Sequence, residues 1–226
     1  MLSLMKKKKM PIERQKPIKE LNYVVVDTEL TGLDERRDSI ISIGAIKMHG
    51  GRIEMGNTFY RLVKPRTAIS RESIIVHEIT PSEVMGEEEI ERVLSDFLGF
   101  CGNDIIVGHF TSIDLSFINR EVKRVYGSPI QNPVLDTFVI YEWLRARGQI
   151  ACPQHYKLYE IAKCLGVPVN GAHNAIMDAF TTAQIFQKFI PMLIAAGIEK
   201  TEDLLRVGNP LRGGERLRVT GEISNF

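Results

Sequence analysis

The chain has 226 residues, of which 44% are hydrophobic and 25% are charged. This composition is that of an ordinary globular protein, and it excludes collagen-like, low-complexity and wholly disordered chains. The length fits one domain of roughly 150–200 residues with additional terminal segments. No apolar run approaches the roughly 20 residues that a helix needs to span a bilayer, so we expect no membrane segment.

Charge is distributed unevenly along the chain. The net charge is +1, but residues 1–20 alone carry seven basic and two acidic side chains, which leaves the remainder mildly acidic. We expect residues 1–20 to be a basic disordered tail, with a weak electrostatic tether to nucleic acid as the functional alternative. The cysteines Cys101, Cys152 and Cys164 show no Cys-x-x-Cys spacing, which disfavours a disulfide framework or a zinc site and favours a reducing cytoplasm.

Three strands are predicted at the start of the ordered part. Residues 22–28 are a short apolar, β-branched run that is typical of a buried strand. Residues 39–48 form a second strand, the Gly50 and Gly51 pair marks a hairpin turn, and residues 52–63 return as a third strand. The domain is therefore predicted to begin as an antiparallel meander.

Helices and single short strands alternate after this meander. Strands are predicted at residues 104–108 and 134–136, and helices from a capping box at residues 80–83 and over residues 90–98, 115–126, 137–147, 158–165 and 175–194. We expect the last helix to bend or break near Pro191. The order predicts an α/β fold with a mixed sheet, three antiparallel strands followed by two short parallel strands, flanked by helices.

Asp27 and Glu29 stand at the end of the first predicted strand. Side chains two residues apart on a strand share a face, so the two carboxylates project together. Like charges this close leave one group protonated unless a cation intervenes, and carboxylate oxygen favours Mg²⁺ or Mn²⁺. The pair therefore indicates a divalent metal site, with a solvated strand end as the alternative.

Two more aspartates stand near predicted helix starts. Asp114 follows a short buried strand, and N-capping is the commonest reason for aspartate there. Asp178 follows His173 by five residues, a spacing that would separate the two by roughly 140° on one helix. If Asn174 caps the helix, His173 lies on the preceding loop and both side chains reach one site. The alternative is a surface histidine with a favourable first-turn acid.

Taken together, these motifs resemble the DEDD exonuclease superfamily in its histidine-containing branch (DEDDh), which includes the proofreading epsilon subunit of bacterial DNA polymerase III. The resemblance extends from about residue 22 to about residue 189 and includes the string Val-Asp-Thr-Glu-Leu-Thr-Gly-Leu at residues 26–33. Three positions depart from the family pattern: Leu30 replaces a commoner threonine, Phe110 replaces the usual asparagine, and Glu78 stands where glycine is frequent. None of them is an expected metal ligand.

The resemblance implies an RNase H-like fold and hydrolysis of phosphodiester bonds from a 3′ end with two metal ions, releasing nucleoside 5′-monophosphates. It implies that two Mg²⁺ or Mn²⁺ ions are held by Asp27, Glu29, Asp114 and Asp178. His173 would be the general base. Substrate contacts are expected from Thr28, Leu30, Leu33, His109 and Phe110, with a structural role as the alternative for His109. Asp136 is interpreted as an N-cap or supporting group outside the metal set.

Three functions remain open at this point. The chain is expected to be a single-stranded DNA exonuclease. The first alternative is an RNA or oligoribonucleotide exonuclease, because discrimination between the two sugars depends on local 2′-OH contacts. The second alternative is a non-catalytic nucleic-acid-binding subunit. The expected partners are 3′ ends of DNA or RNA. The chain would act on them either as a DNA polymerase subunit or as a stand-alone enzyme.

We expect the exonuclease domain over residues 21–194, followed by a polar extension over residues 195–226 with a short helix at 201–207.

Overall fold

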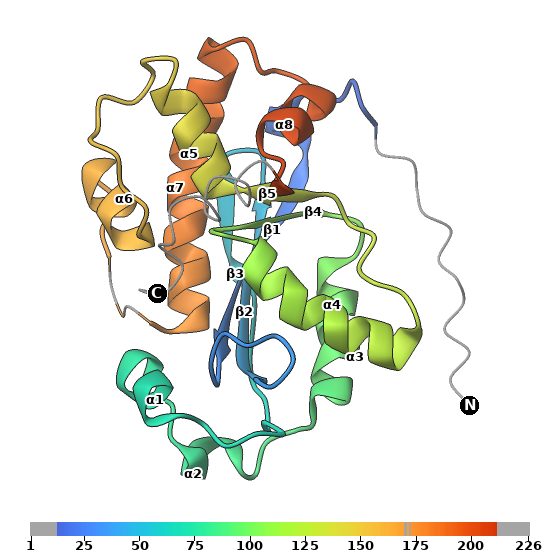
Figure 1. The fold of residues 1–226 in the computed structure, drawn as a ribbon. Coiled ribbons are helices and arrows are strands. Elements are labelled where there is room, and N and C mark those ends of the chain that lie inside the picture. The colour runs from blue at the N-terminus through green and yellow to red at the C-terminus, as the bar shows by residue number, and fades with distance from the viewer. Residues whose placement is uncertain (1–12, 170, 172, 212–226) are drawn as a thin grey trace.

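The computed structural model describes residues 13–169, 171 and 173–211. Its centre is one five-stranded sheet in the order β3-β2-β1-β4-β5 (Figure 1). The strands β1 (Asn22–Leu30), β2 (Ile40–His49) and β3 (Arg52–Leu62) are antiparallel neighbours, and β4 (Ile105–Gly108) and β5 (Val134–Asp136) extend the sheet in parallel beside β1. The predicted mixed sheet of three antiparallel and two parallel strands is confirmed.

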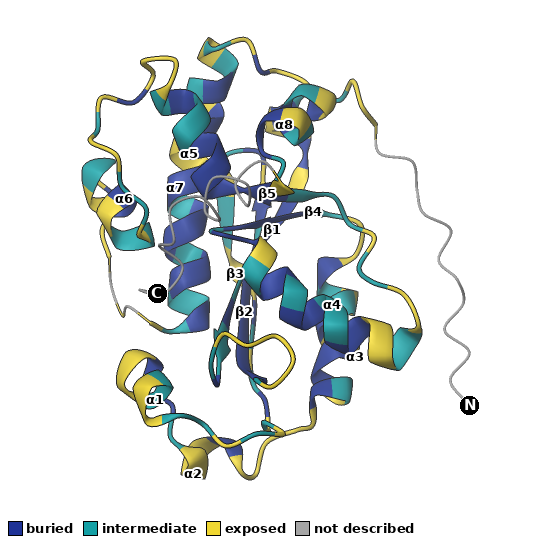
Figure 2. Cartoon of the chain, viewed as in Figure 1, coloured by how far each residue is buried: buried dark blue, intermediate teal, exposed yellow. Residues whose placement is uncertain are grey.

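Helices cover both faces of this sheet. On one face lies α7 (Ala175–Ala195), accompanied by α5 (Thr137–Arg145), α6 (Leu158–Cys164) and α8 (Thr201–Val207); on the other lie α3 (Ile90–Cys101) and α4 (Ser112–Tyr126). The short helices α1 (Arg71–His77) and α2 (Pro81–Val84) lie together beyond one end of the sheet and are largely exposed (Figure 2). Among the helices of the described residues, none is long and apolar enough to cross a membrane.

The side chains of β1 alternate between two separate cores. Tyr23 and Val25 pack with the α7 side of the molecule, while Val24 and Val26 pack with α3 and α4. A strand has a side-chain period of two, so both cores depend on the same unbroken apolar run. Because β1 is covered on both faces, its position is well defined, and so is the direction of the polar residues that follow Val26.

Some predicted helix ends differ from the observed ones. The helix α4 begins at Ser112, so Asp114 lies in its first turn. The interpretation of Asp114 as an N-cap is therefore wrong. The expected break near Pro191 is absent, and α7 continues through it. A proline removes one hydrogen bond from the helix, but fully buried side chains on both sides of it, Phe189 and Leu193, keep α7 packed against the core.

Residues 13–20 are ordered, which corrects the expectation that all of residues 1–20 form a disordered tail. The 3₁₀ helix η1 (Ile18–Glu20) places Ile18 in the main core, where it is 1% exposed. The Thr201 N–H donates to the Lys16 carbonyl at 3.0 Å, so the segment is tied to the start of α8. The sequence did not predict this contact, because one isoleucine within a basic stretch does not produce the hydrophobic periodicity of a helix or strand. The expected tail residues 1–12 lie outside the described residues.

The expected polar extension begins as part of the same folded body. Its predicted helix at residues 201–207 is confirmed as α8, which buries Leu204 and Val207 in the core shared with α7. Just beyond α8, the Gly208 carbonyl accepts a hydrogen bond from the Asp136 N–H at 2.9 Å. The rest of the expected extension, residues 212–226, lies outside the described residues.

One cysteine pair also departs from expectation. Cys152 and Cys164 form a disulfide, with their Cα atoms 6.2 Å apart, and Cys101 is a free buried thiol. The expectation that disfavoured a disulfide framework is therefore wrong for this pair. The irregular segment before α6 turns back toward the C-terminal end of that helix, a path that a spacing of 12 residues does not reveal.

Candidate active site

Three carboxylates meet where β1 ends and α7 begins. One oxygen each from Asp27, Glu29 and Asp178 lies within 4.8 Å of the others. Asp27 and Glu29 continue the side-chain alternation that sends Val25 toward α7. Asp178 projects from the first turn of α7. The structure therefore brings three of the four expected metal ligands to one place.

The fourth expected ligand, Asp114, is bound to Thr28, the residue between Asp27 and Glu29, and its charge raises the pKa of Asp27. Its Oδ1 accepts hydrogen bonds from the Thr28 N–H at 2.9 Å and from the Thr28 hydroxyl at 2.6 Å. Thr28 belongs to the opposite alternation from Asp27, so it points toward α4, which carries Asp114. Thr28 was expected to contact substrate. Its hydroxyl is instead bonded to Asp114, and Thr28 is only 9% exposed.

The electrostatics of these four groups are unfavourable without a cation. Burial raises the pKa of each one, and repulsion among the carboxylates adds to the rise at Asp27 and Glu29. The pKa reaches about 8 at Glu29 and about 7 at Asp114. Over residues 13–169, 171 and 173–211, no lysine or arginine forms a salt bridge with any of the four.

This donor set fits a divalent metal. Carboxylates that would otherwise share protons at neutral pH become fully charged when a cation replaces those protons. Oxygen ligands alone favour Mg²⁺ or Mn²⁺ over softer metals. The buried position of the cluster also strengthens the attraction between carboxylate and cation. The arrangement of Asp27, Glu29 and Asp178 therefore suits metal binding better than it suits a solvated strand end.

His173 lies on the loop immediately before α7, as the expected cap requires. Asn174 is the N-cap, and its side-chain oxygen accepts a hydrogen bond from the Ile176 N–H at 3.2 Å. His173 is exposed and has a left-handed backbone with φ of 61°. Burial raises the pKa of Asp178, and the charge of His173 opposes that rise. The His173 ring packs edge-to-face on Tyr159, with ring centroids 5.3 Å apart, and the Tyr159 hydroxyl is bonded to Asp178.

Sequence reasoning assigned no role to Tyr159, which the structure places in the site. From α6, its hydroxyl donates to Asp178 Oδ1 at 2.5 Å and accepts from the His173 N–H at 2.7 Å. The sequence signal was weak, because a tyrosine near the start of a short helix is commonly a packing residue. The resemblance to the exonuclease family extends over this region, but it assigned no role to the tyrosine.

Two of the expected substrate residues are engaged within the fold. His109 is hydrogen-bonded to Thr137 at 3.0 Å and to the Tyr156 carbonyl at 2.9 Å, and burial lowers its pKa to about 4. These contacts favour the structural alternative for His109. Phe110 is 4% exposed, and its ring centroid lies 4.6 Å from that of Phe138. Stacking of a base on Phe110 would require this packing to change.

The other two expected substrate residues are more open. Leu33, on the loop after β1, is 48% exposed, and Leu30 at the end of β1 is half-buried. Leu30 directly follows Glu29 on the chain and packs against the core that includes α3 and α4, and Leu33 stands three residues further along. A base at the end of a strand could stack there without any change in the core.

Asp136 behaves as the expected cap. Its carboxylate accepts hydrogen bonds from the Phe138 N–H at 2.9 Å, which caps α5, and from the Thr111 N–H at 3.1 Å. Burial raises the pKa of this group to about 6, although the backbone donors oppose the rise. By bonding to Thr111, the N-cap position of α4, Asp136 supports the turn that leads to Asp114. The N-cap interpretation is confirmed.

Fold and sequence together place the chain in the exonuclease family, since the profile of that family (RNase_T) matches residues 24–186. The mixed sheet and its helices are RNase H-like, as the resemblance implied. The chain is therefore a member of a family of nucleases that hydrolyse nucleic acids.

Two bacterial relatives narrow this class. DNA polymerase III subunit epsilon of Aquifex aeolicus is 37% identical over 171 residues, which are 76% of this chain and 81% of that protein. The PolC-type DNA polymerase III of Thermotoga maritima is 36% identical over 186 residues, which are 82% of this chain but only 13% of that polymerase. The chain thus spans most of an epsilon subunit and a small part of a PolC-type polymerase.

Solved structures share the fold at lower identity. Exonuclease X in complex with 5′ overhanging duplex DNA has a TM-score of 0.62 and 23% identity, and the match covers 83% of this chain and 99% of that one. E. coli Exonuclease I in complex with a dT13 oligonucleotide has a TM-score of 0.69 and 17% identity, covering 79% of this chain and 43% of that one. Both support the RNase H-like architecture.

Proposed function

We propose that the chain is a metal-dependent 3′–5′ exonuclease that releases nucleoside 5′-monophosphates from single-stranded DNA. The observation that carries the proposal is the carboxylate cluster, with Asp27, Glu29 and Asp178 oxygens within 4.8 Å of one another. Buried like charges without a neutralising cation cost stability, so a cluster of this kind points to a site that binds a metal and does chemistry. The cluster argues against a purely non-catalytic binding subunit.

The four carboxylates would hold two Mg²⁺ or Mn²⁺ ions: Asp27, Glu29, Asp114 and Asp178. When bound, the metals would polarise the scissile phosphate and stabilise charge on the attacking and leaving oxygens. Asp114 is held by Thr28 and Asp178 by Tyr159, so each carboxylate has a fixed orientation before any metal arrives. Preorganised ligands of this kind lower the cost of assembling the site.

His173 would accept the proton of the attacking water. Imidazole is the side chain best suited to exchange a proton near neutral pH. The exposed loop position of His173 leaves its ring open to solvent and substrate, while its backbone is tied to Tyr159 beside Asp178. Base and metal ligands would thus act at one centre.

Single-stranded DNA is the favoured substrate because the two relatives described above, each more than 30% identical, are DNA polymerase III proteins. Leu33, exposed on the loop after β1, offers a surface on which a terminal base could stack. An RNA or oligoribonucleotide exonuclease would use the same carboxylates and remains the alternative. Association with a DNA polymerase, as an epsilon-like subunit, is the proposed setting, and a stand-alone role in repair is the other.

The test uses single-stranded DNA and RNA of one sequence, labelled at either end. We expect early release of labelled mononucleotide from the 3′-labelled DNA and a shortening ladder from the 5′-labelled DNA, both abolished by EDTA. The Asp178→Ala variant should be inactive, whereas Asp96→Ala, which removes an exposed aspartate from α3, should retain full activity. Faster degradation of RNA would select the alternative, and no release from either polymer in Mg²⁺ or Mn²⁺ would refute the proposal.

A further inference from the structure

The hydroxyl of Tyr159 forms two hydrogen bonds of opposite polarity. It donates to Asp178 Oδ1 at 2.5 Å and accepts from the His173 N–H at 2.7 Å. An O–H group that donates to a carboxylate at this distance forms a strong, charge-assisted hydrogen bond. One oxygen atom therefore connects an expected metal ligand to the backbone of the expected base.

The conformation of His173 explains why such a connection is needed. Its φ of 61° lies in the left-handed region, which is uncommon and strained for a residue with a side chain. The residue precedes α7 and has no helix or strand of its own to hold it. Among the described residues, the hydrogen bond to Tyr159 and an edge-to-face contact, with ring centroids 5.3 Å apart, help to hold it in place.

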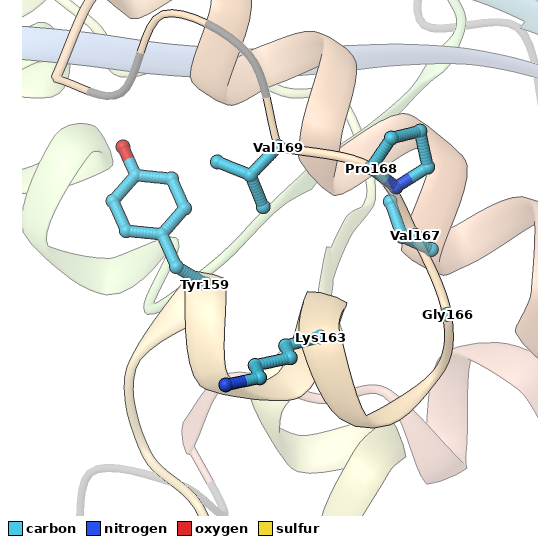
Figure 3. A pocket seen from close by; sticks show the side chains of 6 residues that line it. All are labelled: Tyr159, Lys163, Gly166, Val167, Pro168 and Val169. Carbon is cyan, nitrogen blue, oxygen red and sulfur yellow. The ribbon is translucent and has the colours of Figure 1, made fainter.

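Core packing holds Tyr159 only in part. It lies in the first turn of α6 and is half-buried, and its ring forms one wall of a pocket of about 590 Å³. Figure 3 shows the ring extending from α6 with Val169 beside it and Lys163 below, on the same helix. Since the ring borders open space, the two hydrogen bonds determine where the hydroxyl lies, and a phenylalanine fits at this position.

We propose that Tyr159 is a positioning residue, which orients the Asp178 carboxylate for metal binding and holds His173 in its left-handed conformation beside the same centre. This inference rests on the proposed function. Hydrogen-bonding partners behind metal ligands typically contribute 10–100-fold to metal affinity or activity. Tyr159 should therefore affect both the metal and the base, although it is not one of the proposed metal ligands.

The test compares Tyr159→Phe with the matched control Tyr141→Phe in the full chain. Tyr141, on α5, also donates its hydroxyl to one acceptor, the Pro153 carbonyl at 2.7 Å, but it contacts no carboxylate of the cluster. Calorimetric titration with Mn²⁺ should show affinity 10–100-fold weaker in Tyr159→Phe and within twofold of wild type in Tyr141→Phe. Unchanged Mn²⁺ affinity in Tyr159→Phe would overturn the inference.

A second measurement follows the His173 amide by hydrogen exchange. In the wild-type chain this amide should exchange more slowly than in an unstructured peptide, and the protection should be lost in Tyr159→Phe but kept in Tyr141→Phe. An unprotected His173 amide in the wild type would refute the inference without any variant. Excess Mn²⁺ should partly restore the kcat of Tyr159→Phe and leave Asp178→Ala inactive.

The two proposals fail separately. Metal binding and amide exchange need no nucleic acid, so a wild-type chain that released no nucleotide would refute the proposed function while Tyr159 could still be tested. Conversely, an active wild type matched by Tyr159→Phe in Mn²⁺ affinity, exchange and kcat would refute the role of Tyr159 alone.

Discussion

Gly44 of β2 is paired with Asp27 of β1, at the point where α7 begins. A Cβ atom on Gly44 would lie 2.2 Å from the carbonyl carbon of Ala175, far closer than any real contact. The first turn of α7 therefore rests directly on the backbone of β2, and this close approach brings Asp178 to the carboxylates of β1. A glycine inside a buried strand is the sequence signal of such an approach.

Gly44→Ala should accordingly destabilise the protein and impair its site. We expect a loss of about 1–3 kcal/mol, as for other overpacked positions, and lower nuclease activity because α7 must move away with Asp178. Gly56→Ala is the control, since a Cβ at Gly56 on β3 meets nothing within 4 Å. Urea unfolding and nucleotide release measure the two effects. A Gly44→Ala variant as stable as Gly56→Ala would contradict this account of the packing.

Removing one carboxylate should separate stability from activity. Asp27→Ala should lose cleavage, because a metal ligand is missing, yet its metal-free form should be at least as stable as wild type because repulsion is relieved. Thermal unfolding with EDTA and with Mg²⁺ measures this, and Mg²⁺ should raise the Tm of wild type much more than that of the variant. Near-normal turnover of Asp27→Ala in Mg²⁺ would show that Asp27 is not a ligand.

The metal-free protein should become less stable as pH rises from about 6.5 to 8.5. Burial and repulsion raise the pKa of Glu29 to about 8, and burial raises that of Asp114 to about 7. In this window the folded state holds protons that the unfolded state has lost, so stability falls with rising pH. The buried His109 has a lowered pKa and would oppose this trend only at lower pH.

The pH effect is measured by the Tm in EDTA at several pH values. Saturating Mg²⁺ should flatten the curve, because the cation replaces the protons, and Asp27→Ala should reduce its slope. A Tm that rises with pH across this window would contradict the electrostatic description of the cluster.

His173→Ala should act on turnover and leave metal binding intact. A positioned general base contributes about 10²–10⁴-fold, so kcat should fall within that range and recover in part at high pH, where hydroxide replaces the base. His49→Ala, at the exposed end of β2, serves as the control. If His173→Ala lost Mn²⁺ affinity in calorimetry, the histidine would be a ligand instead.

Two N-terminal truncations should behave differently. Removing residues 1–12, which include Lys6 to Lys9, should leave kcat on a short oligonucleotide unchanged and weaken binding to long strands only at low salt. Removing residues 1–20 also deletes the buried Ile18, and should cost about 2–5 kcal/mol as loss of a core side chain does. Equal unfolding curves for the two truncations would show that residues 13–20 add nothing to the fold.

Local patterns in the sequence determined the sheet and part of the site. The apolar run before Asp27 and the glycine pair after His49 were sufficient to predict β1 and the β2–β3 hairpin. The two-residue period of a strand placed Asp27 and Glu29 on one face, and the capping preference of Asn174 separated His173 from the helix. Each of these depends on residues close together in the chain, where periodicity and capping leave a readable signal.

Beyond the set of metal ligands that the family resemblance implied, only the tertiary structure decided which distant side chains meet. Thr28 holds Asp114 from 86 residues away, and Tyr159 joins α6 to the start of α7. The docking of Ile18 and the pairing of Cys152 with Cys164 likewise departed from what spacing and composition predicted. Such contacts follow from how helices pack on the sheet, and packing is determined by shape complementarity across the whole core, which no local pattern of residues encodes.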